Sequence, residues 1–183
     1  MTFEVEMNEP CRLCGSKATE TFAEANKRHY LRCETCLLVF VIQDELPDLE
    51  VERAEYGLHH NDPADQGYRT HLSKLTRPLV TGIPVPAHGL DFGCGPGPTI
   101  SVMLAEQGFD MADYDPAFFP DEALLQKQYD FVSCTEVVEH FYNPGRDFEL
   151  LARLLKPGGR FGIMTQLLSD DIDFEHWYYA REI

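Results

Sequence analysis

The sequence predicts an α/β fold in which a mostly parallel sheet follows a small metal-binding β module. Three observations support this prediction. From residue 89 onward, short apolar segments alternate with amphipathic ones, as in a parallel sheet with crossover helices. A glycine-rich turn, residues 93–98, follows the first apolar segment. Four cysteines in two close pairs lie between residues 11 and 36.

Length and composition set the outer limits of the fold. A chain of 183 residues is long enough for one α/β domain and a small module. Its longest apolar run, Leu37–Ile42, is too short to cross a bilayer. The acidic N-terminus also does not have the basic and then apolar pattern of a signal peptide. We therefore expect a cytoplasmic protein that does not contact a membrane.

The charge balance argues against one class of partner. A net charge of −16 does not provide the basic surface that tight, non-specific nucleic-acid binding requires. The one basic stretch, Lys27–His29 with Arg32 nearby, is more typical of a solvated turn. Nucleic acid is therefore not favoured as a partner, although recognition of a structured RNA by a local patch stays open.

The cysteine pairs have the spacing of a zinc site. They form the pattern C-x2-C-x18-C-x2-C, made of Cys11, Cys14, Cys33 and Cys36. Four thiolates at this spacing close a tetrahedral structural site, and a reducing cytosol favours metal ligation over disulfides. Residues 20–24 and 29–31 predict a hairpin that turns near Asn26, and residues 37–42 predict a further strand. Because so small a module has little core, we expect zinc to contribute much of the folding energy of residues 1–43.

The remaining elements follow in order along the chain. Residues 44–67 are acidic and aperiodic, which predicts a linker or lid before a larger domain at 68–183. An amphipathic helix is expected at 68–80, weakened near its end by Pro78. The other predicted elements are strands at 89–92, 111–114, 129–135 and 160–165, helices at 99–107 and 147–155, and a turn at 156–159.

The glycine-rich turn indicates which ligand the sheet holds. Residues 89–98 read Gly-Leu-Asp-Phe-Gly-Cys-Gly-Pro-Gly-Pro. Glycine tolerates positive φ and lets the backbone lie against a ligand. The dinucleotide fingerprint G-x-G-x-x-G would need a third glycine at position 98, which is Pro98. With its D-x-G-x-G-x-G form, the chain instead resembles the class I S-adenosylmethionine-dependent methyltransferases.

Two later segments add to the resemblance. Residues 129–141 run into a Glu-His-hydrophobic sequence, and residues 154–161, Leu-Leu-Lys-Pro-Gly-Gly-Arg-Phe, match the family's turn into its fifth strand. The resemblance covers about residues 89–166 and implies a Rossmann-like sheet with S-adenosylmethionine as cofactor. It also implies that Thr135 and Glu136 line the cofactor pocket.

Acidic residues at the ends of the first two strands suit this cofactor. Asp115 is placed to accept the ribose hydroxyls, the role of an acid at this position in dinucleotide folds. Asp91 is placed to orient the glycine loop or to meet the ammonium group. Carboxylates suit an ammonium and a sulfonium but repel a pyrophosphate, which favours S-adenosylmethionine over NAD. The predicted cofactor-binding residues are Asp91, Gly93, Cys94, Gly95, Gly97, Asp115, Pro116, Asp121, Thr135 and Glu136.

The chain departs from the family pattern in two places. Only 13 residues, 116–128, join the second strand to the next clear one, so the usual helix and third strand hardly fit. The family pattern then leads us to expect Phe118–Phe119 as a vestigial third strand and Asp121 in place of the acid that meets the adenine amine. Only 18 residues follow Thr165, where the family adds two more strands. We therefore expect the last strand to be a sheet edge, covered by a tail segment or by a second copy in a homodimer.

The sequence predicts a methyltransferase that acts on a small-molecule acceptor, with the zinc module as a platform. The acidic charge favours a small molecule over rRNA. Tyr56, His59 and Tyr68 are candidates for a lid that excludes water. His140 is a candidate general base or substrate contact, with a residue packed at a helix start as the alternative. A cofactor-binding scaffold without catalysis is the competing interpretation, and a dehydrogenase is disfavoured by the glycine spacing.

Overall fold

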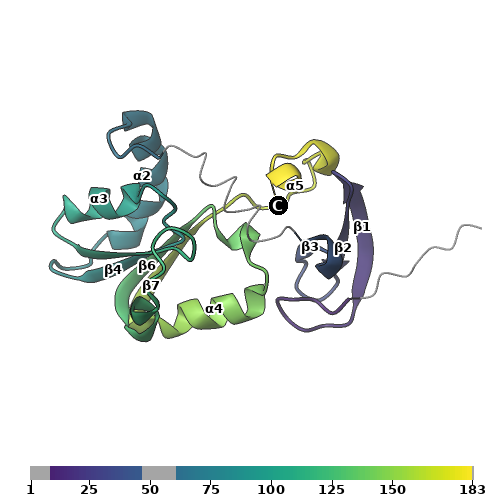
Figure 1. Ribbon diagram of the computed structural model, residues 1–183, viewed down its shortest axis with the longest axis horizontal. Coiled ribbons are helices and arrows are strands. Elements are labelled where there is room, and N and C mark those ends of the chain that lie inside the picture. Colours follow the sequence, from purple (N-terminus) through teal and green to yellow (C-terminus); the bar gives the residue numbers. More distant parts are fainter. Residues whose placement is uncertain (1–8, 47–60, 183) are drawn as a thin grey trace, which may run out of the picture. The chain divides into compact units, whose positions relative to one another are not determined.

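The computed structural model describes residues 9–46 and 61–182 (Figure 1). The chain divides into two compact units. The first combines the N-terminal cysteine module with two later segments, 139–147 and 167–183, and the second comprises residues 49–138 and 148–166. The domain boundaries drawn from the sequence stay a prediction. Within the described residues, none of the helices combines the length and apolar character needed to cross a membrane.

The first unit is built on a three-stranded antiparallel sheet in the order β1-β2-β3. Its elements are β1 (Thr19–Ala25), β2 (Arg28–Cys33), β3 (Val39–Val41) and the 3-10 turn η1 (Gln43–Glu45). Strands β1 and β2 form the predicted hairpin. Asn26 and Lys27 turn it with φ values of +51° and +63°, the left-handed pair that a two-residue hairpin turn of type I′ requires.

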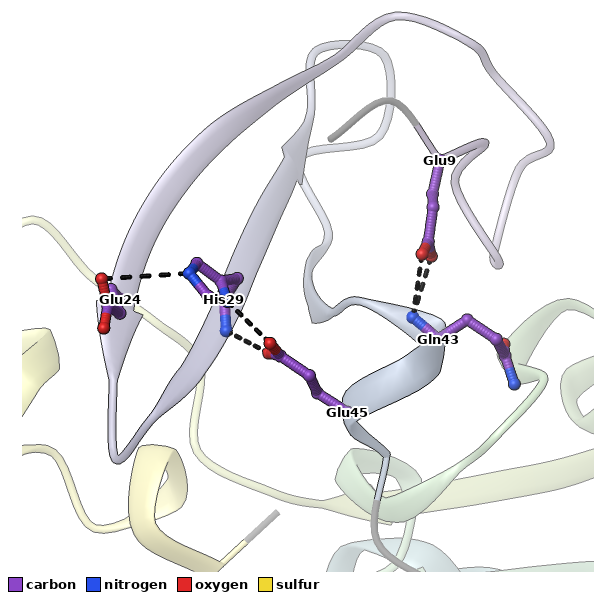
Figure 2. A network of polar contacts seen from close by, with 5 residues as sticks. All are labelled: Glu9, Glu24, His29, Gln43 and Glu45. Carbon is purple, nitrogen blue, oxygen red and sulfur yellow. Dashed lines mark hydrogen bonds and ion pairs between the residues drawn. The ribbon is translucent and has the colours of Figure 1, made fainter. Parts of the chain in front are cut away.

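A polar network holds η1 against the hairpin (Figure 2). The Nδ1 atom of His29 lies 2.7 Å from Glu45 Oε1, and its Nε2 atom lies 3.9 Å from Glu24 Oε2. The backbone N–H of Gln43 donates to the carboxylate of Glu9 at 3.0 and 3.1 Å. The hydrogen bond to Glu45 raises the pKa of His29 because the carboxylate stabilises the imidazolium.

The C-terminal tail packs on the same hairpin. It contains η4 (Phe174–His176) and the short helix α5 (Tyr179–Glu182). The ring of Phe174 meets Phe22 and Tyr30 edge to face, with centroids 5.1 and 4.8 Å apart. The carbonyl of Ala180 accepts hydrogen bonds from the Asn26 side chain at 2.6 Å and from the Tyr30 hydroxyl at 3.1 Å. The tail is therefore an integral part of the first unit.

The second unit contains a four-stranded sheet in the order β5-β4-β6-β7, with every pair parallel. The strands are β4 (His88–Phe92), β5 (Asp110–Tyr114), β6 (Tyr129–Thr135) and β7 (Leu155–Met164). The helical elements are α2 (Gln66–Val80), α3 (Thr99–Ala105), η2 (Glu122–Gln126), η3 (Val138–His140) and α4 (Pro144–Arg153). This architecture confirms the predicted α/β class with a Rossmann-like parallel sheet.

The helix predicted at 68–80 forms as α2 and ends at the expected residue, Val80, with Pro78 inside it. Proline removes one N–H donor, but Leu79 and Val80 are 6% and 8% exposed, so their burial holds the last turn in place. The main buried apolar residues are Leu72, Leu75, Leu79, Ile100, Leu104, Phe109 and Phe131.

The segment between β5 and β6 corrects another prediction. Phe118–Phe119 does not form a third parallel strand: Phe119 instead makes an isolated antiparallel bridge to Asp115, which closes a tight turn. The turn forms because the Asp115 side chain accepts backbone N–H groups from the two residues after Pro116. Among the described residues β7 pairs only with β6, so it lies at a sheet edge as expected. The cover for that edge stays a prediction.

Candidate functional site

The loop from β4 to α3 depends on its glycines. Gly93 and Gly95 have φ values of +73° and +63°, which side-chain-bearing residues rarely adopt. Gly97 is required by space, since a Cβ there would lie 2.2 Å from the backbone oxygen of Asn61. A Cβ on Gly93 would also lie 2.5 Å from Val137 Cγ2. The loop therefore keeps its shape only with glycine at these positions.

Three carboxylates gather on one face of the sheet beside this loop. Asp91 of β4 lies in register with Asp113 of β5, and Asp115 follows two residues later, so all three point to the same side. Ser133, in register on β6, donates its hydroxyl to Asp91 at 2.7 Å. Ser101 of α3 donates to Asp113. The acids thus gather at the carboxyl ends of the strands, and each accepts hydrogen bonds from donors of its own.

The electrostatics of the cluster are unfavourable without a cation. Asp91 is only 4% exposed, and its burial raises its pKa to about 7, with the charges of Asp113 and Asp115 adding to the rise against the Ser133 hydrogen bond. Burial also raises the pKa of Asp113. A positively charged ligand group placed here would favour the ionised carboxylates.

Asp115 joins the end of β5 to the glycine loop. Its Oδ2 accepts the Gly95 N–H at 3.0 Å, and its Oδ1 accepts the N–H groups of Ala117 and Phe118 at 2.8 and 3.1 Å. A carboxylate has about four acceptor sites, so this one retains capacity for a further donor. The position of Asp115 at the end of β5 suits the binding of ribose hydroxyls, which stays a prediction.

The carboxyl end of β6 carries two features typical of ligand sites. The Oγ1 atom of Thr135 is buried and has no hydrogen-bond partner. Glu136 has a φ of +53°, an uncommon conformation for a residue with a side chain, while its N–H donates to Met164 O at 2.8 Å. A buried hydroxyl without a partner and a strained neighbour fit a site completed by a bound molecule.

The four cysteines form a cage of the size that zinc requires. Their sulfur atoms lie within 4.8 Å of one another, with Cys11–Cys36 at 3.5 Å and Cys14–Cys33 at 3.6 Å. A tetrahedral zinc with Zn–S bonds of about 2.3 Å has sulfur–sulfur edges of about 3.8 Å. Backbone N–H groups of Cys36 and Thr35 lower the pKa of Cys33 to about 6 by stabilising its thiolate. Burial instead raises the pKa of Cys11 and Cys36, whose thiolates then depend on the metal for stabilisation. The residues present therefore fit a thiolate-bound zinc ion.

Each of the two C-x-x-C knuckles contains a backbone turn of the same type. The N–H of Gly15 donates to Cys11 O at 2.8 Å, and the N–H of Leu37 donates to Cys33 O at 2.9 Å. Gly15 and Leu37 have φ values of +71° and +66°. Leu37 therefore takes up the left-handed conformation for which glycine is the usual residue, at a conformational cost.

One family model matches most of the chain, from the second unit to the C-terminal segments of the first. Residues 64–183 match the family model described as "Methyltransferase domain". The chain belongs to this methyltransferase family. The matched region contains the glycine loop and its acids, whereas the four cysteines precede it.

The similar proteins match only part of this chain. The ubiquinone biosynthesis O-methyltransferases of Aeromonas salmonicida (strain A449) and Klebsiella pneumoniae (strain 342) are 31% and 33% identical over 77 residues, 42% of this chain and 32% of those proteins. The chain thus spans about a third of the curated relatives it matches. Among solved structures, the PH0226 protein of Pyrococcus horikoshii OT3 is 21% identical, with a TM-score of 0.47 over 60% of this chain and 64% of that one. The plantazolicin methyltransferase BpumL, in complex with a pentazolic analog and SAH, is 17% identical, with a TM-score of 0.37 over 77% and 71%.

The structure brings one predicted lid residue close to the acids. Tyr68 of α2 is half-buried, and burial raises its pKa, as do the charges of Asp91 and Glu136. Tyr68 is therefore close enough to both acids to sense their charge. Tyr56 and His59 lie outside the described residues.

Three other predicted site residues lie in exposed or half-buried positions. Asp121 is exposed and caps η2, accepting the Ala123 N–H at 3.0 Å. Pro116 is exposed at the turn after Asp115. His140 ends η3, is half-buried, and belongs to the segment 139–147 of the first unit. Their roles with adenine, cofactor and acceptor stay predictions.

Sequence reasoning missed two residues that shape the loop and its acids. Asn61 contributes the backbone oxygen against Gly97, and its side-chain nitrogen is 3.7 Å from a Cβ built on Gly95. No local pattern marks it. Ser133 could have been found, because it is a hydroxyl inside an apolar strand, on the strand that the resemblance already placed at the site.

Proposed function

We propose that this chain is an S-adenosylmethionine-dependent methyltransferase that acts on a small-molecule acceptor. The observation that carries the proposal is the buried acid cluster beside the glycine loop. Asp91, Asp113 and Asp115 favour a ligand with an ammonium and a sulfonium group, and they disfavour a pyrophosphate. Membership of the methyltransferase family supports the reaction type.

The residues at the strand ends would each bind a different part of the cofactor. Asp91 would attract the cationic part of the cofactor, Asp115 would accept ribose hydroxyls, and the unpartnered hydroxyl of Thr135 would gain a hydrogen bond. When bound, S-adenosylmethionine supplies an activated methyl group. The chain's own task is then to align an acceptor atom with that methyl and to exclude water, which accounts for much of the rate enhancement in such displacements. Tyr68 on α2 contributes to the exclusion of water.

An oxygen nucleophile is the acceptor class to test first. The curated relatives are named as O-methyltransferases, and a net charge of −16 disfavours rRNA. A hydroxyl acceptor must lose its proton during transfer. His140, in the segment that follows β6, is the residue we assign to receive it.

Methyl transfer is tested with the zinc-loaded full chain and tritium-labelled S-adenosylmethionine. Phenols and catechols of varied charge serve as acceptors, with rRNA in a parallel reaction, and Asp170→Asn serves as an exposed-site control for Asp91→Asn. We expect labelled product and stoichiometric S-adenosylhomocysteine with at least one hydroxyl acceptor, lost in Asp91→Asn only. Label on rRNA alone would contradict the small-molecule assignment. Cofactor binding without transfer to any acceptor would favour the scaffold interpretation.

A further inference from the structure

The first cysteine knuckle holds the segment 139–147 through its backbone. The N–H of Gly145 donates to the carbonyl of Arg12 at 3.1 Å. Arg12 lies between Cys11 and Cys14, two of the four cage residues. A hydrogen bond therefore runs from inside the knuckle to the first turn of α4, which begins at Pro144.

Gly145 permits a close approach that another residue would block. A Cβ at this position would lie 2.9 Å from Leu13 O and 3.0 Å from Arg12 O. Both obstacles are backbone atoms, which cannot rotate away as the end of a side chain can. The segment and the knuckle thus meet backbone to backbone, and each restricts where the other can lie.

The side chain of Arg12 makes the same connection a second time. Its guanidinium donates to the Tyr142 carbonyl at 3.3 Å and to the Val41 carbonyl on β3. Its guanidinium carbon also lies 5.3 Å from the centroid of the Phe40 ring. One half-buried cation therefore joins the knuckle, β3 and the segment.

The held segment continues directly from the proposed cofactor site. Glu136 directly follows β6, and η3 (Val138–His140) comes next along the chain. The segment 139–147 therefore includes His140. We propose that the four-cysteine site sets the conformation of residues 139–147, with Arg12 and Gly145 as the positioning residues. The knuckle turn then acts on the methyl-transfer reaction through this segment. This inference rests on the proposed function for its catalytic consequence, whereas the structural link itself does not.

The link has a physical cause in the size of the module. Its apolar core is small, with Leu31 and Phe40 as the large buried residues around Cys11 and Cys33. Metal binding supplies folding energy to modules of this kind, so removal of the metal frees the backbone of the knuckle. The Arg12 carbonyl then no longer presents a fixed acceptor to Gly145.

Amide hydrogen exchange by NMR on the full chain tests the link without any substrate. We expect the Gly145 N–H to exchange at least tenfold faster when zinc is chelated, because its acceptor becomes mobile. The N–H of Val132, inside β6 of the second unit, is the internal control and should keep its protection. Gly145 protection that is the same with and without zinc, while Val132 stays protected, would overturn the inference.

Variants that keep the cage intact provide the second test. Arg12→Met retains the apolar stem but removes the donors, and Gly145→Ala inserts the clashing Cβ; Arg32→Met on β2 and Gly67→Ala in α2 are the matched controls. In both test variants, zinc content and the affinity for S-adenosylmethionine should stay within twofold of the unsubstituted chain. The amide exchange rate at His140 should rise, and kcat should fall at least tenfold while the KM for the cofactor is unchanged. Unchanged exchange and kcat in both would overturn the inference.

The two proposals fail in different ways. If the exchange rate of the Gly145 amide depends on zinc but the chain does not bind S-adenosylmethionine, only the proposed function is contradicted. If the chain transfers methyl groups but the exchange rate of the Gly145 amide does not depend on zinc, only the inference is contradicted.

Discussion

Replacing Asp91 with asparagine is expected to make the ligand-free protein more stable and cofactor binding weaker. The carboxyl is 4% exposed, and its pKa is raised from 3.8 to about 7. Because the folded pKa is the higher one, the folded state holds this proton more tightly than the unfolded chain. The ionisation of Asp91 therefore does not reduce the free energy of unfolding below pH 3.8. The reduction grows as the pH rises from there and is largest above pH 7.

The size of the effect follows from these two pKa values. At 1.36 kcal/mol for each pKa unit, the penalty is at most about 4 kcal/mol at pH 8 and about 2 kcal/mol at pH 5.5. The asparagine side chain would carry no charge, and its amide would offer donors to Asp113 and Asp115. Asp91→Asn should therefore gain about 2 kcal/mol more stability at pH 8 than at pH 5.5.

Urea unfolding of the zinc-loaded chain at the two pH values measures this difference, followed by circular dichroism. Asp170→Asn, at an exposed position, should show no such difference between the two pH values. Affinity for S-adenosylmethionine should fall at least tenfold in Asp91→Asn. A variant that is destabilised equally at pH 5.5 and pH 8 would refute the argument, since Asp91 would then be a satisfied structural carboxylate.

Two further predictions concern the glycine loop and the network of Figure 2. Gly97→Ala places a Cβ 2.2 Å from Asn61 O, so we expect a loss of about 1–3 kcal/mol in unfolding free energy and at least tenfold weaker cofactor binding. Gly67→Ala in α2 is the control in both measurements, and equal behaviour of the two variants would contradict the steric argument. The hydrogen bond between His29 and Glu45 raises the pKa of His29. The stability that this bond adds to the folded state is therefore fully present below about pH 6.5 and is lost as the pH rises through the folded pKa. His29→Ala should then cost more stability at pH 5.5 than at pH 8.5, by under about 1 kcal/mol because the pair is partly solvated, and a larger loss at pH 8.5 would contradict the assignment.

Local patterns predicted much of the fold. The apolar run at 129–135 gave β6 its bounds, and the leucine periodicity gave the buried face of α2. The C-x-x-C spacing predicted that the four cysteines share one site, and their sulfur atoms do form one cage. The acids at the ends of β4 and β5 followed from the rule that ligands bind at the carboxyl ends of parallel strands.

Contacts between distant parts of the chain had no such signal. Asn61 packs on Gly97 through a backbone oxygen, which no residue type encodes. Gly145 lies in an ordinary Asn-Pro-Gly helix start, and only the structure shows that its missing side chain makes room for the knuckle. Phe118–Phe119 was predicted as a vestigial third strand from the family pattern, but the Asx turn at Asp115 folds it back. The hydrogen bonds of one side chain in a turn therefore decided a segment that the resemblance could not.

Calorimetric titration of the zinc-loaded full chain with S-adenosylmethionine, S-adenosylhomocysteine and NAD tests the central claim most directly. The acid cluster around Asp91 predicts binding of both adenosyl ligands, tighter for the sulfonium than for the neutral thioether, and no heat with NAD. Binding of NAD, or no binding of either adenosyl compound, would contradict the account.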